Sequence, residues 1–180
     1  VIFVYSLKLG GNLLLGMIAL FGIGLVHMAT NLLDDYFDYK DDKYMQFSQN
    51  CKCAYLKNGH ASVNDLKTAI IVFLALAGFI GAFLFFASGI YVALLALIGL
   101  VVALTYQKFS IKGLGEIAII IAYGPLLYEG VYYVMTSHFS WTVCLLSLAC
   151  AFLTNTILYV HMLMDFDGDV EADKKTLCTT

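Results

Sequence analysis

Nine of the ten aspartates in this 180-residue chain fall into two short clusters. The first cluster places five aspartates within nine residues: Asp34, Asp35, Asp38, Asp41 and Asp42. The second cluster places four within nine residues: Asp165, Asp167, Asp169 and Asp173. Carboxylates at this density repel one another unless a cation lies between them, so we expect the two clusters to bind cations.

Each cluster repeats aspartate at every fourth residue, at 34, 38 and 42 and again at 165, 169 and 173. A four-residue step turns an α-helix by about 400°, so the carboxylates of each series share one helix face. Carboxylate oxygens suit Mg²⁺, which proteins commonly share with substrate phosphates. Three lysines beside the clusters can bind the outer oxygens of a diphosphate: Lys40, Lys174 and Lys175. The alternative, two solvated helix ends, is disfavoured because aspartate at a helix C-terminus opposes the helix dipole.

The elements that carry these clusters must cross a membrane. Hydrophobic residues make up 61% of the chain and charged residues 13%, and the mean hydropathy is +0.85. A soluble domain is about half apolar, so the composition indicates a polytopic membrane protein. The chain contains no arginine, which argues against a nucleic-acid surface.

Five segments are apolar and close to the length of about 20 residues that a spanning helix needs. They cover residues 11–35, 67–87, 90–107, 115–136 and 140–164. We expect a long polar loop over residues 36–66, tight turns at 88–89 and 137–139, and a kink in the fourth segment at Pro125. Residues 1–9 resemble the tail of an earlier helix, so we expect the chain to be an internal piece of a longer protein.

Nine of the ten lysines fall on one side of the membrane if these segments alternate in direction. Only Lys8 falls on the other side. The positive-inside rule makes the lysine-rich side cytoplasmic. Both aspartate clusters lie at helix ends on that side, so we expect them to face each other there.

Residues 34–42, with the sequence DDYFDYKDD, resemble the first motif of the UbiA-type prenyltransferase superfamily, N-D-x-x-D-x-x-x-D. Residues 165–177 are similar to its second motif, D-x-x-x-D-x-x-G-K-x-T-L in outline. The segment from Tyr106 to Glu116, the pair Gly124-Pro125 and residues 130–133 are similar to the branch that makes menaquinone. Three positions depart from the family pattern. Asp34 replaces the asparagine of the first motif, although Asn31 lies one turn earlier. His161 stands where an asparagine often precedes the second motif, and Asp173 stands where the second motif often has glycine.

The resemblance implies an all-α fold, a polytopic transmembrane helical bundle of roughly nine helices. About five of these helices lie in this piece. Residues 1–180 then form a single, partial membrane domain. It implies Mg²⁺ as cofactor and four catalytic aspartates: Asp35, Asp38, Asp165 and Asp169. The implied metal ligands are these four with Asp34, Asp42 and Asp173. The implied substrate-binding residues are Asn31, Lys40, Tyr106, Lys108, Lys112, His161 and Lys174.

The implied reaction transfers a prenyl group from a polyprenyl diphosphate to an aromatic acceptor, with the active site on the cytoplasmic side of a bacterial or archaeal inner membrane. The menaquinone branch implies 1,4-dihydroxy-2-naphthoate as the acceptor. Other acceptors of the superfamily stay open: 4-hydroxybenzoate, a glycerol-phosphate lipid or a haem precursor. The expected partners are these substrates and membrane lipid, without nucleic acid.

Rival interpretations use the same acids differently. A cation transporter or channel would place acids midway along its helices, whereas these lie at helix ends. A CDP-alcohol phosphotransferase needs an arginine after Asp-Gly, and Asp167-Gly168 is followed by none. A purely structural subunit would not need nine clustered aspartates. The Cys51-x-Cys53 pair is a weak metal or redox signal. His27 and Glu129 lie in apolar segments, where such groups usually face a cavity or a partner.

Overall fold

The computed structural model describes residues 10–40, 54–110, 114–164, 166–171 and 178–179. Throughout these ranges the chain forms helices and short connections, with no β-strand. The helical elements are α2 (Leu13–Lys40), α4 (Ala54–Lys57), α5 (Val63–Ser88), α6 (Ile90–Ser110), α7 (Gly115–Ile121), η1 (Ala122–Leu126), α8 (Leu127–Thr136), α9 (Trp141–Met164) and α10 (Phe166–Glu171). The all-α prediction is confirmed.

Four helices among the described residues are long and apolar enough to cross a membrane: Leu13–Lys40, Val63–Ser88, Gly115–Thr136 and Trp141–Met164. A fifth apolar stretch, Ile90–Tyr106, is shorter. These five correspond to the five segments expected from the sequence. Their outward side chains are largely apolar, as a lipid-facing surface requires.

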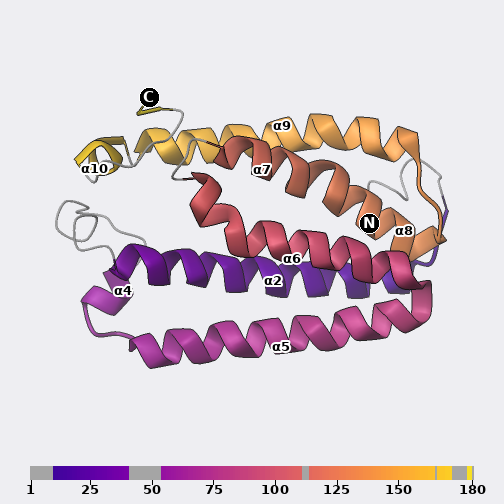
Figure 1. Ribbon diagram of the computed structural model, residues 1–180, viewed down its shortest axis with the longest axis horizontal. Helices are drawn as coiled ribbons and strands as arrows, with labels where there is room; N and C mark the ends of the chain where they lie inside the picture. The colour runs from indigo at the N-terminus through magenta and orange to yellow at the C-terminus, as the bar shows by residue number, and fades with distance from the viewer. Residues whose placement is uncertain (1–9, 41–53, 111–113, 165, 172–177, 180) are drawn as a thin grey trace.

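Successive long helices run in opposite directions, so their connections alternate between the two ends of the bundle (Figure 1). The aspartate end, as we call it, contains the C-terminal end of α2 together with α4, the start of α5 and α10. The turn end contains the connection from α5 to α6 and that from α8 to α9. In between, α2 packs along α5, while α9 packs on α7 and η1, and α6 contacts both groups.

The helix from Gly115 to Thr136 is broken at Gly124, as the sequence predicted for Pro125. Gly124 has φ −106° and ψ −111°, outside the helical range, and the five residues of η1 form a π-turn. A Cβ atom at Gly124 would lie only 2.7 Å from the Cβ atom of Ala151. The kink therefore brings this backbone into close contact with α9, where only glycine fits.

The prediction of a loop over residues 36–66 was wrong at both ends, because α2 extends into that range and α5 begins within it. α2 continues to Lys40 because Tyr36 and Tyr39 pack with Leu56 of α4 in one hydrophobic cluster. α4 adds a helical turn inside the expected loop.

α5 begins four residues earlier than the expected start at residue 67, because Ser62 and Asp65 form a capping box. The Ser62 hydroxyl accepts a hydrogen bond from the Asp65 N–H at 3.1 Å, and the Asp65 carboxylate accepts one from the Ser62 N–H at 2.9 Å. This reciprocal pairing satisfies two backbone donors at the helix start.

Candidate active site

The described members of the first aspartate cluster lie in the last two turns of α2. Asp34, Asp35 and Asp38 all lie on the helix and are half-buried. Asp34 and Asp38 are four residues apart, so they share a helix face, as the sequence predicted. Asp42, the third member of that series, lies outside the described residues.

Tyr55 of α4 holds one of these carboxylates in place. Its hydroxyl donates a hydrogen bond to Oδ2 of Asp35 at 2.9 Å. α4 packs on α2 and α5 through Leu56, which is buried between them. The short helix thus delivers a hydroxyl group to the first motif across a separation of 20 residues in sequence. Nothing in the sequence indicated this contact.

Two lysines converge on the aromatic ring beside Asp35. Lys40 Nζ lies 5.0 Å from the centre of the Tyr36 ring, and Lys67 Nζ from α5 lies 5.6 Å from it. Both distances are within the range of a cation–π contact. Lys40 was predicted as a substrate-binding residue. Lys67 was not, although the lysine count had placed it on the same side.

The second cluster follows α9, which ends at Met164. Asp167 and Asp169 belong to the short helix α10, where Asp169 is buried, with 3% of its surface exposed, and Asp167 is exposed. Figure 1 shows α10 at the same end of the bundle as the C-terminal end of α2. The expectation that both clusters share one end is therefore confirmed for their described members. Asp165, Asp173 and Lys174 lie outside the described residues.

The other predicted substrate-binding residues are spread over three helices. Asn31 is exposed one turn before Asp35 on α2, and His161 is exposed in the last turn of α9. Tyr106 is half-buried on α6. Lys108 belongs to the last turn of α6, but its side chain is not among those described, and Lys112 lies outside the described residues.

Carboxylate oxygens dominate the donors of the aspartate end, and these are the ligands that Mg²⁺ prefers. Within the described ranges, no three histidine, cysteine or acidic side chains come together to hold a metal ion. Three of the seven predicted metal ligands lie outside those ranges, so the metal site stays a prediction. The donor chemistry of Asp34, Asp35 and Asp38 fits the ion.

Glu129 belongs to the turn end and not to the aspartate end. The side chain is 9% exposed, and its Oε2 accepts a hydrogen bond from the Ser140 N–H at 3.2 Å. Ser140 immediately precedes α9. Glu129 therefore links α8 to the start of α9 through Oε2, while its Oε1 is buried without a hydrogen-bond partner among the described residues.

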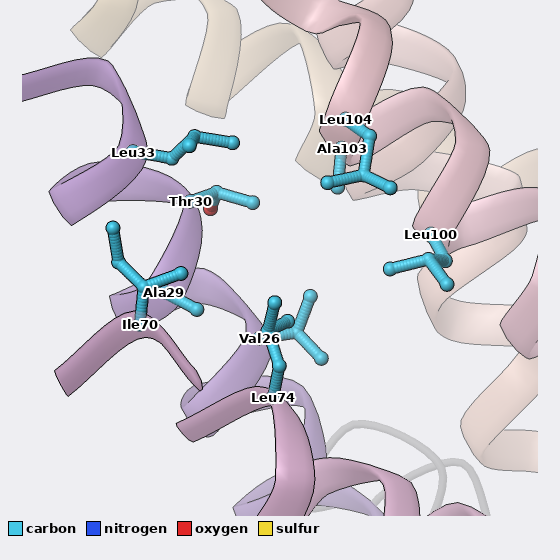
Figure 2. Close-up of a pocket in the computed structure, with 9 residues that line it drawn as sticks. All are labelled: Val26, Ala29, Thr30, Leu33, Ile70, Leu74, Leu100, Ala103 and Leu104. Carbon is cyan, nitrogen blue, oxygen red and sulfur yellow. The ribbon is translucent and has the colours of Figure 1, made fainter. Parts of the chain in front are cut away.

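A small apolar pocket lies between α2, α5 and α6 (Figure 2). Its lining residues are Val26, Ala29, Thr30, Leu33, Ile70, Leu74, Leu100, Ala103 and Leu104. Leu33 is the neighbour of Asp34, so the pocket begins directly beside the first aspartate cluster. Its surface suits a hydrocarbon group and not a charged one.

A sequence model of the UbiA prenyltransferase family matches residues 1–180, which is the whole chain. Three curated proteins described as 1,4-dihydroxy-2-naphthoate octaprenyltransferase are similar to it. The protein from Haemophilus influenzae is 24% identical over 178 residues, covering 93% of this chain and 58% of the relative. Those from Escherichia coli and Bacillus subtilis are 26% and 25% identical, covering 91% and 92% of this chain and 56% and 54% of the relative.

The chain thus spans a little over half the length of the curated relatives it matches. No solved structure matches the chain significantly.

Proposed function

Since this chain belongs to the UbiA prenyltransferase family, we propose that the protein transfers a prenyl group from a polyprenyl diphosphate to an aromatic acceptor. The names of the three relatives specify 1,4-dihydroxy-2-naphthoate and an octaprenyl group. We propose the same naphthoate as the acceptor here, which gives the reaction a role in menaquinone biosynthesis.

The observation that carries this proposal is the gathering of acidic side chains from two distant motifs at one end of the bundle. Asp34, Asp35 and Asp38 come from α2, and the buried Asp169 comes from α10. A membrane transporter would place such acids along a path through the bilayer. Acids gathered at one end suit a substrate whose charged group stays at the membrane surface.

Lys40 and Lys67 supply the opposite charge. Both ammonium groups lie beside the Tyr36 ring, next to Asp35. Two like charges converge in this way most favourably when an anion binds between them. We propose that they bind the outer oxygens of the diphosphate. The sequence predicted this role for Lys40 but not for Lys67.

Mg²⁺ would be held by Asp35, Asp38 and Asp169, together with Asp34 and the further predicted ligands Asp42, Asp165 and Asp173. When bound, the ion supplies positive charge against the leaving diphosphate. Tyr55 keeps the Asp35 carboxylate oriented for this role through its hydrogen bond. We propose that the prenyl chain runs along the apolar side chains of α2, α5 and α6 that include Leu33.

The diphosphate leaves with both electrons of its bond to the prenyl carbon, and the electron-rich ring of the acceptor forms the new carbon–carbon bond. The naphthoate then loses its carboxylate as CO2, which restores the aromatic ring. We place the active site on the cytoplasmic side of the inner membrane, because Lys40, Lys57 and Lys67 all lie at the aspartate end.

The test uses membranes from cells that express the full-length protein. They are supplied with radiolabelled farnesyl diphosphate, 1,4-dihydroxy-2-naphthoate and Mg²⁺, with and without EDTA. We expect a prenylated naphthoquinol that disappears with EDTA. A product with 4-hydroxybenzoate instead would change the acceptor and keep the reaction class. No transfer to any aromatic acceptor by a folded protein would refute the proposal.

A further inference from the structure

A histidine and a tyrosine meet near the middle of the α2 helix, away from both aspartate clusters. His27 is the fifteenth of the 28 residues of α2. Its Nδ1 atom shares a hydrogen bond of 2.6 Å with the hydroxyl of Tyr123. The two rings meet edge to face, with their centres 5.8 Å apart and an angle of 83° between their planes. The pair links α2 to the kinked segment η1.

His27 begins a polar stripe that ends at the first aspartate motif. The stripe contains His27, Asn31, Asp34 and Asp38, at steps of four, three and four residues. These steps keep all four side chains on one face of α2. The seven residues from His27 to Asp34 span about 10 Å along the helix. The stripe thus leads from the proposed diphosphate site into the membrane.

Tyr123 is held firmly where it meets the histidine. It precedes Gly124, whose backbone presses against Ala151 of α9, and it is half-buried. The tyrosine is therefore a fixed support for the imidazole ring, and it faces the same polar stripe.

His27 keeps one ring nitrogen available for a ligand. Its side chain is exposed, and within the described part of the chain Nε2 has no hydrogen-bond partner. An exposed imidazole near the middle of a spanning helix is costly unless it faces a cavity or a polar partner. The position therefore calls for a ligand that carries a hydrogen-bonding atom about two helical turns inside the aspartate motif.

Only one of the two proposed substrates meets that requirement. The diphosphate belongs at the aspartates, and the prenyl chain is a hydrocarbon without hydrogen-bonding groups. The aromatic acceptor has hydroxyl groups on a flat apolar ring, and it must approach the prenyl carbon from the side away from the diphosphate. When the acceptor ring reacts with the prenyl carbon, its hydroxyl groups lie close to the depth of His27 in the membrane.

We propose that Nε2 of His27 binds a phenolic oxygen of the aromatic acceptor, and that Tyr123 is a positioning residue that holds the imidazole through Nδ1. This inference rests on the proposed function and adds the acceptor subsite to it. One face of α2 then carries both the residues that bind the diphosphate and the residue that binds the acceptor.

The experiment compares the full-length protein with its His27→Leu, His27→Gln and Tyr123→Phe variants in detergent. Initial rates are measured against 1,4-dihydroxy-2-naphthoate and, separately, against farnesyl diphosphate. Binding of the naphthoate alone is measured by the rise in Tm that it causes without Mg²⁺ or prenyl substrate. His138→Leu is the matched control, since His138 lies at the turn end, where its Nδ1 is 2.6 Å from the Thr136 carbonyl oxygen.

We expect His27→Leu to raise the KM for the naphthoate about tenfold to a hundredfold, the usual cost of leaving one buried polar group unpaired. The KM for farnesyl diphosphate stays unchanged, and the naphthoate no longer raises Tm. His27→Gln recovers part of the affinity, because its amide can both donate and accept. Tyr123→Phe shows a smaller rise in the same constant, and His138→Leu behaves as wild type.

An unchanged KM and Tm response for the naphthoate in His27→Leu would overturn this inference and leave the proposed function intact. If the leucine variant does not fold, unchanged naphthoate constants in both His27→Gln and Tyr123→Phe would overturn it. A wild-type protein that neither binds nor prenylates any aromatic acceptor would overturn the proposed function, and this inference with it.

Discussion

The two ends of the bundle differ in the chemical character of their side chains. At the turn end, five consecutive residues of α8, from Val131 to Met135, are buried among apolar side chains of α2, α5, α6 and α9. Among the described residues of the aspartate end, Leu56, Leu66 and Ile70 form the buried apolar cluster, and the tyrosines packed against it contact Asp35, Lys40 and Lys67. One end is closed by hydrophobic packing, and the other exposes groups of opposite charge.

This difference indicates that stability and chemistry are divided along the length of the helices. Substitutions at the turn end should lower stability and leave the reaction of each folded molecule unchanged. Substitutions of the proposed metal-binding, diphosphate-binding and supporting side chains at the aspartate end should do the reverse. A variant that violates this division would show that the two ends are coupled.

The largest effect is expected for Asp38→Asn, which removes one charge from the first motif and keeps the shape of the side chain. Loss of a group that stabilises transition-state charge costs about 10³-fold in turnover. Prenyl transfer by the variant in membranes should fall by at least that order, with Tm unchanged. Asp65→Asn is the control, because Asp65 lies at the same end but serves the capping box of α5. The Asp65→Asn control should lose stability and keep its turnover. Full activity of Asp38→Asn would refute the proposed metal site.

At the turn end, Met135→Ala should act on stability alone. Met135 is 4% exposed and belongs to a cluster with Val131, Tyr132 and Val143. Truncating a buried methionine to alanine costs about 2–5 kcal/mol through lost contacts and a residual cavity. The Tm in detergent should fall, while turnover per folded molecule stays at the wild-type value. A changed KM for either substrate would contradict the division between the ends.

Tyr55→Phe should weaken catalysis without loosening the fold. The change removes only the hydroxyl that donates to Asp35. A hydrogen bond to a charged group contributes about 1.5–3 kcal/mol at most, so we expect turnover to fall roughly tenfold. The ring still packs beside Leu56, so Tm should stay close to that of the wild type. Equal turnover in the two proteins would show that Asp35 needs no such support.

The smallest effect is expected for Lys67→Gln. An exposed ion pair contributes at most about 1 kcal/mol, so loss of the proposed pairing between Lys67 and the diphosphate should raise the KM for prenyl diphosphate roughly threefold at low salt. The rise should shrink at high ionic strength, which screens exposed charges. Lys57→Gln is the control, because Lys57 is an exposed lysine of α4 at the same end of the bundle and is not one of the two lysines beside the Tyr36 ring. An equal rise in both variants would assign the effect to net charge and not to this position.

The sequence was sufficient for the features that depend on local pattern. The apolar stretches gave the five membrane segments, and Pro125 gave the kink. The alternation of segments gave the common end of the two aspartate clusters. Each of these follows from residues close together in the chain, so no knowledge of tertiary contacts was needed.

Features that depend on tertiary contacts could not be found in this way. Tyr55 and Lys67 reach the first motif from other helices, and no spacing rule connects them to it. The extension of α2 to Lys40 depends on the packing of Tyr36 and Tyr39 with Leu56 of α4, whereas the apolar pattern alone ended the segment at residue 35. The capping box at Ser62 and Asp65 was visible in the sequence, but the apolar pattern alone placed the helix start too late.

The length of α2 has a further consequence for how substrate arrives. Its 28 residues make a helix about 42 Å long, longer than a hydrocarbon layer of about 30 Å. For the proposed reaction, this excess length allows the aspartate-bearing turns to reach the depth of the lipid phosphates, which is where a prenyl diphosphate dissolved in the bilayer holds its own phosphates. Such a molecule reaches the site by lateral diffusion within one leaflet. The rate of encounter then follows the mole fraction of prenyl lipid in the membrane, so adding empty vesicles that exchange lipid with the enzyme's membrane should slow the reaction by surface dilution alone.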